Sequence, residues 1–211
     1  MPQEMKMRNK LADVLIKTGS IFVLIALGLC IYNQREAFKA DRAVKELLPQ
    51  MVAQIHENQA GWEKKHIGDR IEYLSDSCAM EMDTITVEGH SYIGYLTLPT
   101  LKVELPILSD WSQSKLKIAP CRYTGSVNSK GFVLMGHNYA KGFGQLRNLK
   151  IGDTISFQDV NGTKTTYQVI EIDVLAASAV DEMICEDYDL TLFTCTYGGK
   201  NRFTIRCEKT S

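Results

Sequence analysis

One short run of the chain, TLFTCTYGGKNRF (residues 191–203), combines residue types that could carry out chemistry. A strand-like stretch ends at Cys195, a flexible Gly198-Gly199 pair follows, and Arg202 opens a second strand-like stretch. A cysteine reacts as a nucleophile only as its thiolate, so its site needs a proton partner or a positive charge. The spacing therefore predicts a nucleophilic cysteine, with an arginine that stabilises an oxyanion or binds a substrate carbonyl.

The proton partner is expected among the four histidines of the chain. His56 and His66 fall in the stalk and linker, and His90 falls in a turn, so exposure to solvent accounts for all three. His137 instead ends the apolar strand-like run GFVLMGH, after a glycine that lets the backbone turn sharply. Two strands that end on one rim would bring the His137 imidazole and the Cys195 thiol into the same cleft.

A substrate groove is predicted from the alternation of side chains along a strand. Residues two and four before the nucleophile face the same way as Cys195, and these are Phe193 and Thr191. By the same count Met135 shares the face of the histidine. We expect these three side chains to contact the substrate, together with Thr194 beside the nucleophile. The alternative is that they pack beneath a loop and never meet substrate.

The last strand-like run, RFTIRC, carries a second arginine. Alternation places Arg206 on the face of Arg202, with Phe203 and Ile205 on the other. Arg206 is therefore an alternative for the arginine role, although we expect its replacement by lysine to be mild. The same alternation assigns Cys207 to the core.

The elements that must position these residues are short strands separated by turns, from about Thr84 onward. Because little helix lies between them, they predict a mostly β fold, a single closed or nearly closed barrel of about seven to eight strands with short helices. The stretch LAASAVDEM (residues 175–183) is expected to be flexible, and AKGFGQLRNLKIGD to hold a helical turn. The expected strands lie in TITVEGHSYIGYLTL, TLKVELPIL, GFVLMG, DTISFQD, KTTYQVIEIDVLAA, DLTLFTC and RFTIRCEK.

The chain begins with an apolar segment that Lys6, Arg8 and Lys10 precede. Thr18–Tyr32 carries no charge, and with the residues back to Leu11 the segment is long enough to span a bilayer. An uncleaved signal anchor is favoured over a cleaved signal peptide or a lipoprotein signal, because small residues are not placed for cleavage. A buried helix is disfavoured by the flanking charges and the terminal position. The basic residues predict a cytoplasmic amino terminus and an extracellular catalytic domain.

These patterns divide the chain into three parts. Residues 1–33 are expected to form a cytoplasmic tail and transmembrane signal anchor, residues 34–83 a helical stalk and linker, and residues 84–211 the catalytic β-barrel domain. Apolar residues recur at three- and four-residue steps from Ala37 to Ile55, with Pro49 expected to start or kink a turn. The helix would act as a stalk or pack on the domain, and the polar run ENQAGWEKKHIGDRIEYLSDS after it is typical of a linker.

Composition excludes some functions. The formal net charge is −1, with 24 basic and 25 acidic residues, so no basic excess is present to bind a phosphate backbone. Nucleic acid is therefore not expected as a partner. The six cysteines include no pair at CxxC spacing, which argues against a structural zinc site.

Five pieces of the sequence, taken together and in order, resemble one protein family. LPILSD, YTGSV, GHNYAKGFGQLRNLKIGDTI, TLFTC and RFTIRC are similar to the Leu-Pro strand, Tyr-x-Gly segment, Gly-His with Phe-x-x-Leu and Gly-Asp, Thr-Leu-x-Thr-Cys and arginine-initiated last strand of sortases. Sortases are membrane-anchored cysteine transpeptidases of Gram-positive bacterial surfaces. The resemblance covers the chain from about Ile93 to Lys209 and leaves the class of sortase open.

The resemblance implies that Cys195 is the nucleophile, His137 the essential histidine and Arg202 the family's arginine. It implies cleavage of a Leu-Pro-x-Thr-Gly-like sorting signal after the threonine, through a cysteine thioester. The surface protein or pilin would then pass to an amine of peptidoglycan or of a pilin lysine. No cofactor is expected. Some family members bind calcium near the residues that precede the nucleophile, but here we interpret these acids as a solvated loop: Asp181, Glu182, Glu186, Asp187 and Asp189.

Two other functions stay open. An extracellular cysteine protease would hydrolyse the same thioester, because water and an amine attack the same carbon. A non-catalytic, membrane-tethered β-domain would only bind a ligand and would keep Cys195 as an inert core residue. A papain-like fold is disfavoured, since its cysteine precedes its histidine and here His137 precedes Cys195.

Overall fold

The computed structural model of the protein describes residues 2–65 and 82–210. The chain begins with helix α1 (Pro2–Lys65) and divides into two compact units, Met1–Phe38 and Lys39–Ser211. The division falls within α1, a few residues after the predicted end of the membrane anchor, and leaves all but the first five residues of the predicted stalk in the same unit as the barrel.

The first unit contains one stretch that is long and apolar enough to cross a membrane. Residues Leu15–Arg35 have a mean hydropathy of 2.1, and none of this stretch is buried. A helix of about 20 apolar residues matches the thickness of a bilayer core. This stretch therefore fits a membrane anchor.

The second unit begins with the later turns of α1, which pack against strands. Leu47, Met51 and Ile55 are at most 3% exposed and share one cluster with Tyr92 and Leu108. Their four-residue spacing puts all three on one face of the helix. Of the two roles considered for this helix, packing on the domain is therefore the one observed.

The expected boundaries of the linker need correction. Pro49 lies inside α1 and neither starts nor ends the helix, which continues to Lys65. The first part of the polar run interpreted as linker is thus helical. The rest of it falls in residues 66–81, which lie outside the described residues.

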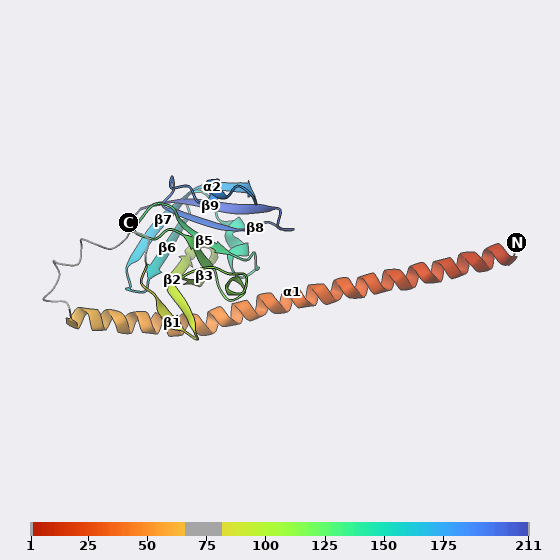
Figure 1. The fold of residues 1–211 in the computed structure, drawn as a ribbon, viewed down its shortest axis with the longest axis horizontal. Coiled ribbons are helices and arrows are strands. Elements are labelled where there is room, and N and C mark those ends of the chain that lie inside the picture. Colours follow the sequence, from red (N-terminus) through yellow and green to blue (C-terminus); the bar gives the residue numbers. More distant parts are fainter. Residues whose placement is uncertain (1, 66–81, 211) are drawn as a thin grey trace. The chain divides into compact units, whose positions relative to one another are not determined.

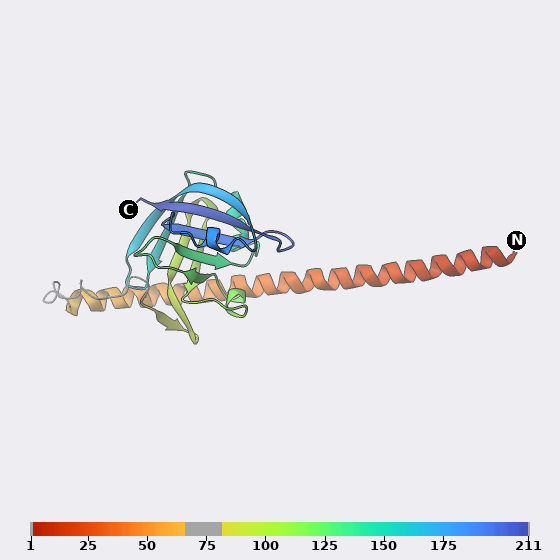
Figure 2. The ribbon, with the colours of Figure 1, turned by 45° about the horizontal axis from the view of Figure 1, so that its top comes forward.

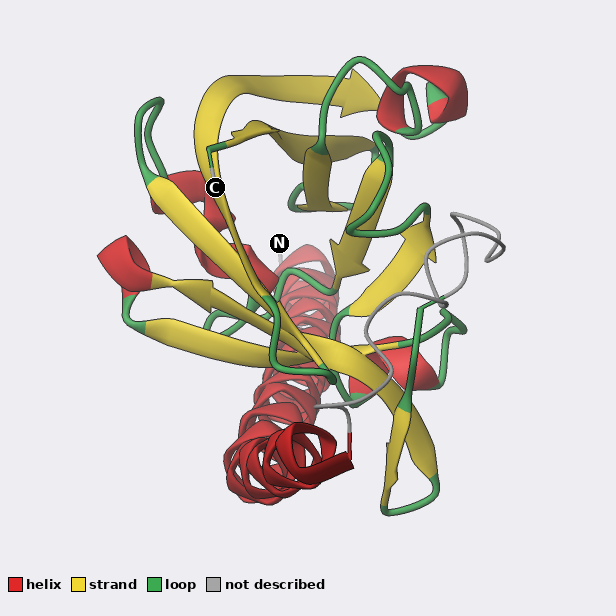
Figure 3. Cartoon of the chain, turned by 90° about the vertical axis from the view of Figure 1, so that its left-hand side faces the viewer, coloured by secondary structure: helices red, strands yellow, loops and turns green. Residues whose placement is uncertain are grey.

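Within the described residues the second unit contains nine strands (Figures 1 and 3). Short helical elements lie between some of them: η1 (Pro99–Leu101), η2 (Lys115–Lys117), η3 (Phe143–Asn148) and α2 (Val180–Met183). The strands are β1 (Ile85–Val87), β2 (His90–Leu98), β3 (Val103–Leu108), β4 (Cys121–Thr124), β5 (Phe132–Gly136), β6 (Thr154–Asp159), β7 (Lys164–Ala176), β8 (Leu190–Cys195) and β9 (Asn201–Lys209).

The strands form one closed barrel. Their order is β1-β2-β3-β4-β5-β8-β9-β7-β6, and β6 also pairs with β2 through Gly94↔Asp159 to Thr97↔Ser156. This last pairing closes a ring that contains every strand except β1, which extends β2 as a hairpin. The ring has eight strands and confirms the predicted mostly β barrel. Strands β8, β9 and β7 lie side by side in this order (Figure 2).

The two faces of the ring bury different sets of side chains. The largest core cluster contains Leu134 of β5, Leu192 of β8 and Ile205 of β9. The neighbouring residues Val133 and Phe193 point to the opposite side, because side chains alternate along a strand, and they pack with Met183 of α2. We call this second side of β5, β8 and β9 the outer face.

Two elements were not predicted. Strand β4 (Cys121–Thr124) was missed, and the stretch expected to be flexible instead contains the end of β7 and helix α2. Both elements border the outer face, which makes them relevant to the site.

Candidate functional site

Strands β5 and β8 bring His137 and Cys195 to the same edge of the barrel. The two strands are parallel neighbours, with Met135 opposite Phe193 and Gly136 opposite Thr194. His137 and Cys195 each come next, so both leave the carboxyl ends of adjacent strands, which lie about 4.8 Å apart in a sheet. The Thr194 hydroxyl donates a hydrogen bond of 2.8 Å to the Gly136 carbonyl, and this bond joins the two strand ends.

The glycine before His137 is required by packing. A β-carbon on Gly136 would lie 2.7 Å from Cγ of Phe143, a ring of η3 that is 1% exposed. Gly136 is not among the residues with positive φ, so the sharp turn expected from the sequence is not its role. Its missing side chain lets η3 pack directly against the strand end that carries His137.

Cys195 and Arg202 are directly opposite each other on the antiparallel pair β8 and β9. Just beyond them, the Thr196 N–H donates to the Asn201 carbonyl at 3.0 Å, so that pair is hydrogen-bonded. Hydrogen-bonded and non-hydrogen-bonded pairs alternate along such a ladder. Cys195 and Arg202 thus form a non-hydrogen-bonded pair, in which the side chains share a face and lie closest together.

The Arg202 guanidinium is held by the loop that precedes it. Nη1 donates to the Gly199 carbonyl at 3.0 Å and to the Asn201 carbonyl at 3.2 Å. Gly198 and Gly199 have φ of 82° and 72°, a region that costs glycine little, so the hairpin can return the arginine to the side of the cysteine. The structure therefore brings together all three residues predicted to be catalytic.

A second contact fixes the loop between β8 and β9. The Arg147 guanidinium of η3 lies over the exposed Tyr197 ring, 4.5 Å from its centroid, and Arg147 Nε also donates to the Gly144 carbonyl. Cation–π contacts of this kind are worth about 0.5–1 kcal/mol at exposed sites. The segments that follow His137 and Cys195 are thereby connected beyond the strands themselves.

Burial changes the acid–base behaviour of the site. It lowers the pKa of His137, and the positive charge of Lys117 adds to this effect, so the neutral imidazole is favoured near pH 7. Burial also raises the pKa of the Cys121 thiol to about 12 and raises that of Cys207. These two cysteines are unreactive core residues, as expected for Cys207, whereas Cys195 is partly exposed.

The four predicted substrate contacts occupy different environments. Met135 is partly exposed and borders the outer-face cluster, whereas Phe193 is 3% exposed beneath Met183. Thr191 is 1% exposed and Thr194 is 3% exposed, and both hydroxyls are hydrogen-bonded inside the protein. Both threonines thus link elements of the fold, and their contact with substrate stays a prediction.

Arg206 is not a rival for Arg202. It is 2% exposed and pairs with Thr191, at the opposite end of β8 from Cys195. Its guanidinium donates to backbone carbonyls beneath α2 instead of facing the rim. Its contacts give a reason to expect more than a mild effect from lysine, whose single nitrogen cannot replace all the bonds of the guanidinium to the Glu182 and Met183 carbonyls.

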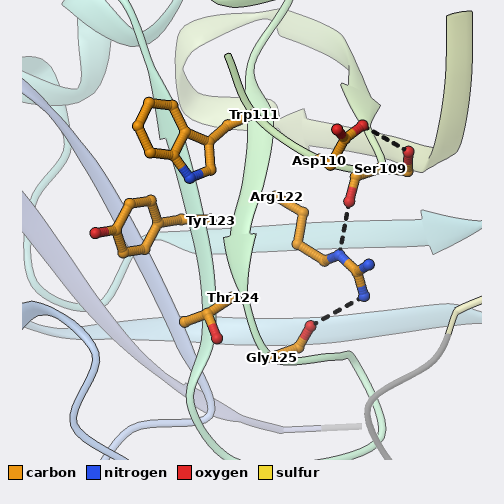
Figure 4. Close-up of a pocket in the computed structure, with 7 residues that line it drawn as sticks. All are labelled: Ser109, Asp110, Trp111, Arg122, Tyr123, Thr124 and Gly125. Carbon is orange, nitrogen blue, oxygen red and sulfur yellow. Dashed lines mark hydrogen bonds between the residues drawn. The ribbon is translucent and has the colours of Figure 1, made fainter.

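A pocket of about 350 Å³ that was not predicted adjoins the outer face (Figure 4). Trp111 stacks on Tyr123 with ring centroids 5.8 Å apart, and Tyr123 meets the edge of Phe193 at 5.5 Å. On the other side of the pocket, Arg122 Nε donates to the Ser109 carbonyl at 2.8 Å. The lining consists of Ser109, Asp110, Trp111, Arg122, Tyr123, Thr124 and Gly125.

The sequence contained one signal for this pocket. The Tyr-x-Gly piece of the family resemblance is Tyr123-Thr124-Gly125, and all three residues line the pocket. Trp111 has no such signal, because its place beside Tyr123 depends on how β3 and β4 pair.

Among the side chains that the structure describes, no group of three or more His, Cys, Asp or Glu residues is able to hold a metal ion. One of the acids before the nucleophile strand has a structural partner, since the Asp189 carboxylate accepts the Lys209 N–H at 2.8 Å.

Comparison with known proteins assigns the fold. Among solved structures, sortase A from Corynebacterium diphtheriae has 22% identity and a TM-score of 0.53, over 58% of this chain and 62% of that one. Sortase C from Clostridium perfringens SM101 has 25% identity and a TM-score of 0.50, over 85% of this chain and 96% of that one. A Clostridium perfringens sortase D5 transpeptidase has 18% identity and a TM-score of 0.56, over 82% and 99%.

Two sequence comparisons were informative in different ways, and the one that found a match agrees with the structural likeness to sortases. No curated protein matches the chain. A family model described as a sortase domain matches residues 96–210, which is more than half of the chain and nearly all of the barrel. On this match the chain belongs to the sortase family, whose members are cysteine transpeptidases.

Proposed function

We propose that the protein cleaves a Leu-Pro-x-Thr-Gly-like sorting signal and transfers the resulting acyl group to a primary amine. The observation that carries this proposal is the meeting of three strand ends. Cys195 adjoins His137 across a parallel pair and Arg202 across an antiparallel pair. A nucleophile, a proton carrier and a cation on one rim suit acyl transfer.

In the first half-reaction the Cys195 thiolate attacks the carbonyl carbon of the substrate threonine. The negative charge that develops on the carbonyl oxygen is stabilised by Arg202. Its bonds to the loop use one nitrogen of a group with five N–H donors, so others can turn to the substrate. The C–N bond then breaks, and His137, in the minority of molecules that carry it as the imidazolium near pH 7, gives its proton to the departing amine. The products are a thioester on Cys195 and a free amine.

In the second half-reaction a primary amine attacks the thioester carbon. The now neutral His137 accepts the proton that the amine loses, and Cys195 leaves as the thiolate. The new amide bond joins the acyl group to its acceptor, and the enzyme returns to its starting protonation state. No cofactor takes part in this scheme.

The outer face would bind the apolar part of the peptide. Met135 is partly exposed next to the strand end of His137, and Leu175 and Tyr123 pack around the same cluster. A leucine-proline pair requires such a surface close to the thiol, because it gains affinity mainly by leaving water. We propose Met135 and Phe193 as parts of this surface, with Phe193 supporting it from beneath Met183.

The substrates would be surface proteins or pilins, and the acceptor an amine of peptidoglycan or of a pilin lysine. We propose that Leu15–Arg35 anchors the protein as a single span, with a cytoplasmic amino terminus and the barrel outside. Protease added to intact cells should then remove the barrel. Protection of the barrel until the cells are lysed would reverse the orientation.

The reaction itself can be tested with the full chain in detergent micelles. Mass spectrometry after incubation with a sorting peptide and triglycine should show cleavage after threonine and transfer to triglycine. Without triglycine, the acyl group should remain on the peptide that contains Cys195. Cys195→Ala should abolish both signals, whereas Cys185→Ala, which also removes a partly exposed thiol, should keep them.

Two outcomes would contradict the proposal. Hydrolysis alone at saturating triglycine would favour the cysteine protease. The absence of cleavage over a panel of sorting peptides, together with an unreactive Cys195, would favour the non-catalytic binding domain.

A further inference from the structure

The segment between β7 and β8, residues 177–189, covers part of the outer face. It contains α2, whose Met183 is 3% exposed and packs with Val133 and Phe193. Phe193 precedes Cys195 by two residues on the same face of β8. The position of α2 therefore decides how much of the apolar surface next to the thiol is open.

One side chain of β9 holds this segment from below. Arg206 Nη2 donates to the Glu182 carbonyl at 2.5 Å, and Nη1 donates to the Met183 carbonyl at 3.3 Å. Nη1 also donates to the Thr191 hydroxyl at 3.1 Å, which ties the same group to β8. A planar guanidinium can serve two carbonyls and a hydroxyl at once, which the single nitrogen of lysine does less well.

The same guanidinium reaches the strand before the segment and the last part of the segment itself. Arg206 Nε lies 3.7 Å from a carboxylate oxygen of Asp173 on β7. Its Cζ lies 4.9 Å from the centre of the Tyr188 ring, and the Tyr188 hydroxyl bonds the Glu171 carboxylate. The contacts of Arg206 thus extend from β7 to the residues just before β8.

Burying the Arg206 guanidinium costs desolvation free energy, which only its polar contacts can offset. Arg206 is 2% exposed, and its Nε makes no hydrogen bond among the described residues, so its link to Asp173 is an ion pair at longer range. An apolar residue of similar length would avoid the desolvation of a guanidinium. Such a residue would also leave the carbonyls of Glu182 and Met183 without this donor, and the segment would no longer be held at a fixed distance from β8.

We propose that Arg206 is a positioning residue, which sets the height of α2 over the outer face and thereby the affinity for the apolar part of the substrate peptide. This inference rests on the proposed function for its substrate. Arg206 does not touch the reacting atoms, since it lies opposite Thr191 and acts through Met183. It should influence binding of the peptide far more than the reactivity of Cys195.

The test compares Arg206→Lys with Ile155→Ala in the full chain. Ile155 is buried in the main core cluster on β6, away from the segment, so its variant reports a general loss of stability. We expect Arg206→Lys to raise the KM for the sorting peptide roughly tenfold, because the loosened segment must be reordered on binding. The kcat should stay within about twofold, and the alkylation rate of Cys195 should stay equal to that of the wild type. Ile155→Ala should leave the KM unchanged.

Hydrogen exchange measured by mass spectrometry gives a readout that needs no substrate. Amides of residues 177–189 should exchange faster in Arg206→Lys and keep the wild-type rate in Ile155→Ala. Unchanged exchange there, or equal changes in both variants, would overturn the inference. If the wild type cleaves no peptide, the proposed function fails. The hydrogen-exchange comparison of the two variants still decides whether Arg206 holds the segment.

Discussion

Replacing Gly136 by alanine tests how the site is positioned. The added carbon would lie 2.7 Å from Cγ and 2.8 Å from Cδ2 of Phe143. Carbon atoms prefer separations of about 3.5–4.0 Å, so the strand end and η3 would be pushed roughly 1 Å apart. The Phe143 ring is 1% exposed and belongs to the main core cluster, so it has no open space into which to turn.

The stability cost follows from two opposing effects. Overpacking of a core costs about 1–3 kcal/mol, and replacing glycine by alanine regains about 0.4–1 kcal/mol by restricting the unfolded chain. The net loss of unfolding free energy is therefore about 0.5–2 kcal/mol, or roughly 2–8 °C in melting temperature for a barrel of this size.

The effect on catalysis should be larger than the effect on stability. Gly136 bonds Thr194 through its carbonyl and precedes His137 directly, so a shift of the strand end moves the imidazole relative to the thiol. A displacement of about 1 Å can lower a rate by up to 10²-fold. We expect kcat/KM for peptide transfer to fall by about 10- to 100-fold, measured by mass spectrometry on the full chain in micelles.

A double substitution separates this explanation from general damage. Phe143→Leu removes the ring that the new methyl group meets, so Gly136→Ala/Phe143→Leu should be more stable than the sum of the two single losses. The coupling free energy should exceed about 0.5 kcal/mol. A Gly136→Ala variant with wild-type melting temperature and activity, or single effects that simply add, would refute the packing explanation.

Three further substitutions address the chemistry. Arg202→Lys keeps the charge but loses the planar fork, and we expect the acylation rate to fall by about 10²–10³ with little change in melting temperature. Lys117→Gln removes a positive charge that helps to lower the pKa of His137, so the pKa of His137 should rise. Because the imidazolium then persists to higher pH, the alkaline limb of the rate–pH profile should shift to higher pH. Phe193→Leu removes the edge contact of an aromatic pair, so the KM for sorting peptide should rise about two- to tenfold while alkylation of Cys195 is unchanged.

Each of these has its own control. Lys150→Gln is the control for Lys117→Gln, because it removes one positive charge at another exposed lysine. If the two variants shift the alkaline limb equally, the shift comes from the net charge and not from His137. Full acylation activity in Arg202→Lys would remove the arginine from the oxyanion role. Equal losses of affinity and of thiol reactivity in Phe193→Leu would mean damage to the fold.

Alternation and turn residues predicted much of this fold, because they are local signals. The runs DTISFQD and KTTYQVIEIDVLAA contain β6 and β7 as expected, and the turn between them includes Gly162 with a φ of 83°. The same period of two placed Met135 and Phe193 on one face, and both border the outer-face cluster. Residue order alone was therefore enough to predict a barrel with the cysteine and the histidine at strand ends.

What could not be predicted depends on contacts between distant segments. Strand β4 has only four residues, and a single residue pair, Leu108↔Cys121, joins it to β3. The packing of Phe143 on Gly136 and the bonds of Arg206 to the α2 segment arise only when the ring is closed. The hydrogen bond of Thr194 to the Gly136 carbonyl could not be predicted either, because proximity to the nucleophile in sequence says nothing about the side to which a hydroxyl points.

The parallel pairing of β5 with β8 also has a kinetic consequence. Strands β6 and β7 lie between them in the chain, so His137 and Cys195 meet only after a long loop has closed. Topologies rich in such distant pairings fold in about milliseconds to seconds. Until β8 docks against β5, Cys195 lacks His137 as its neighbour, although the local hairpin of β8 and β9 can already bring Arg202 beside it. Under the proposed mechanism, the onset of acylation of Cys195 by a sorting peptide during refolding would therefore time the closure of the barrel, and an incompletely folded chain would be inactive.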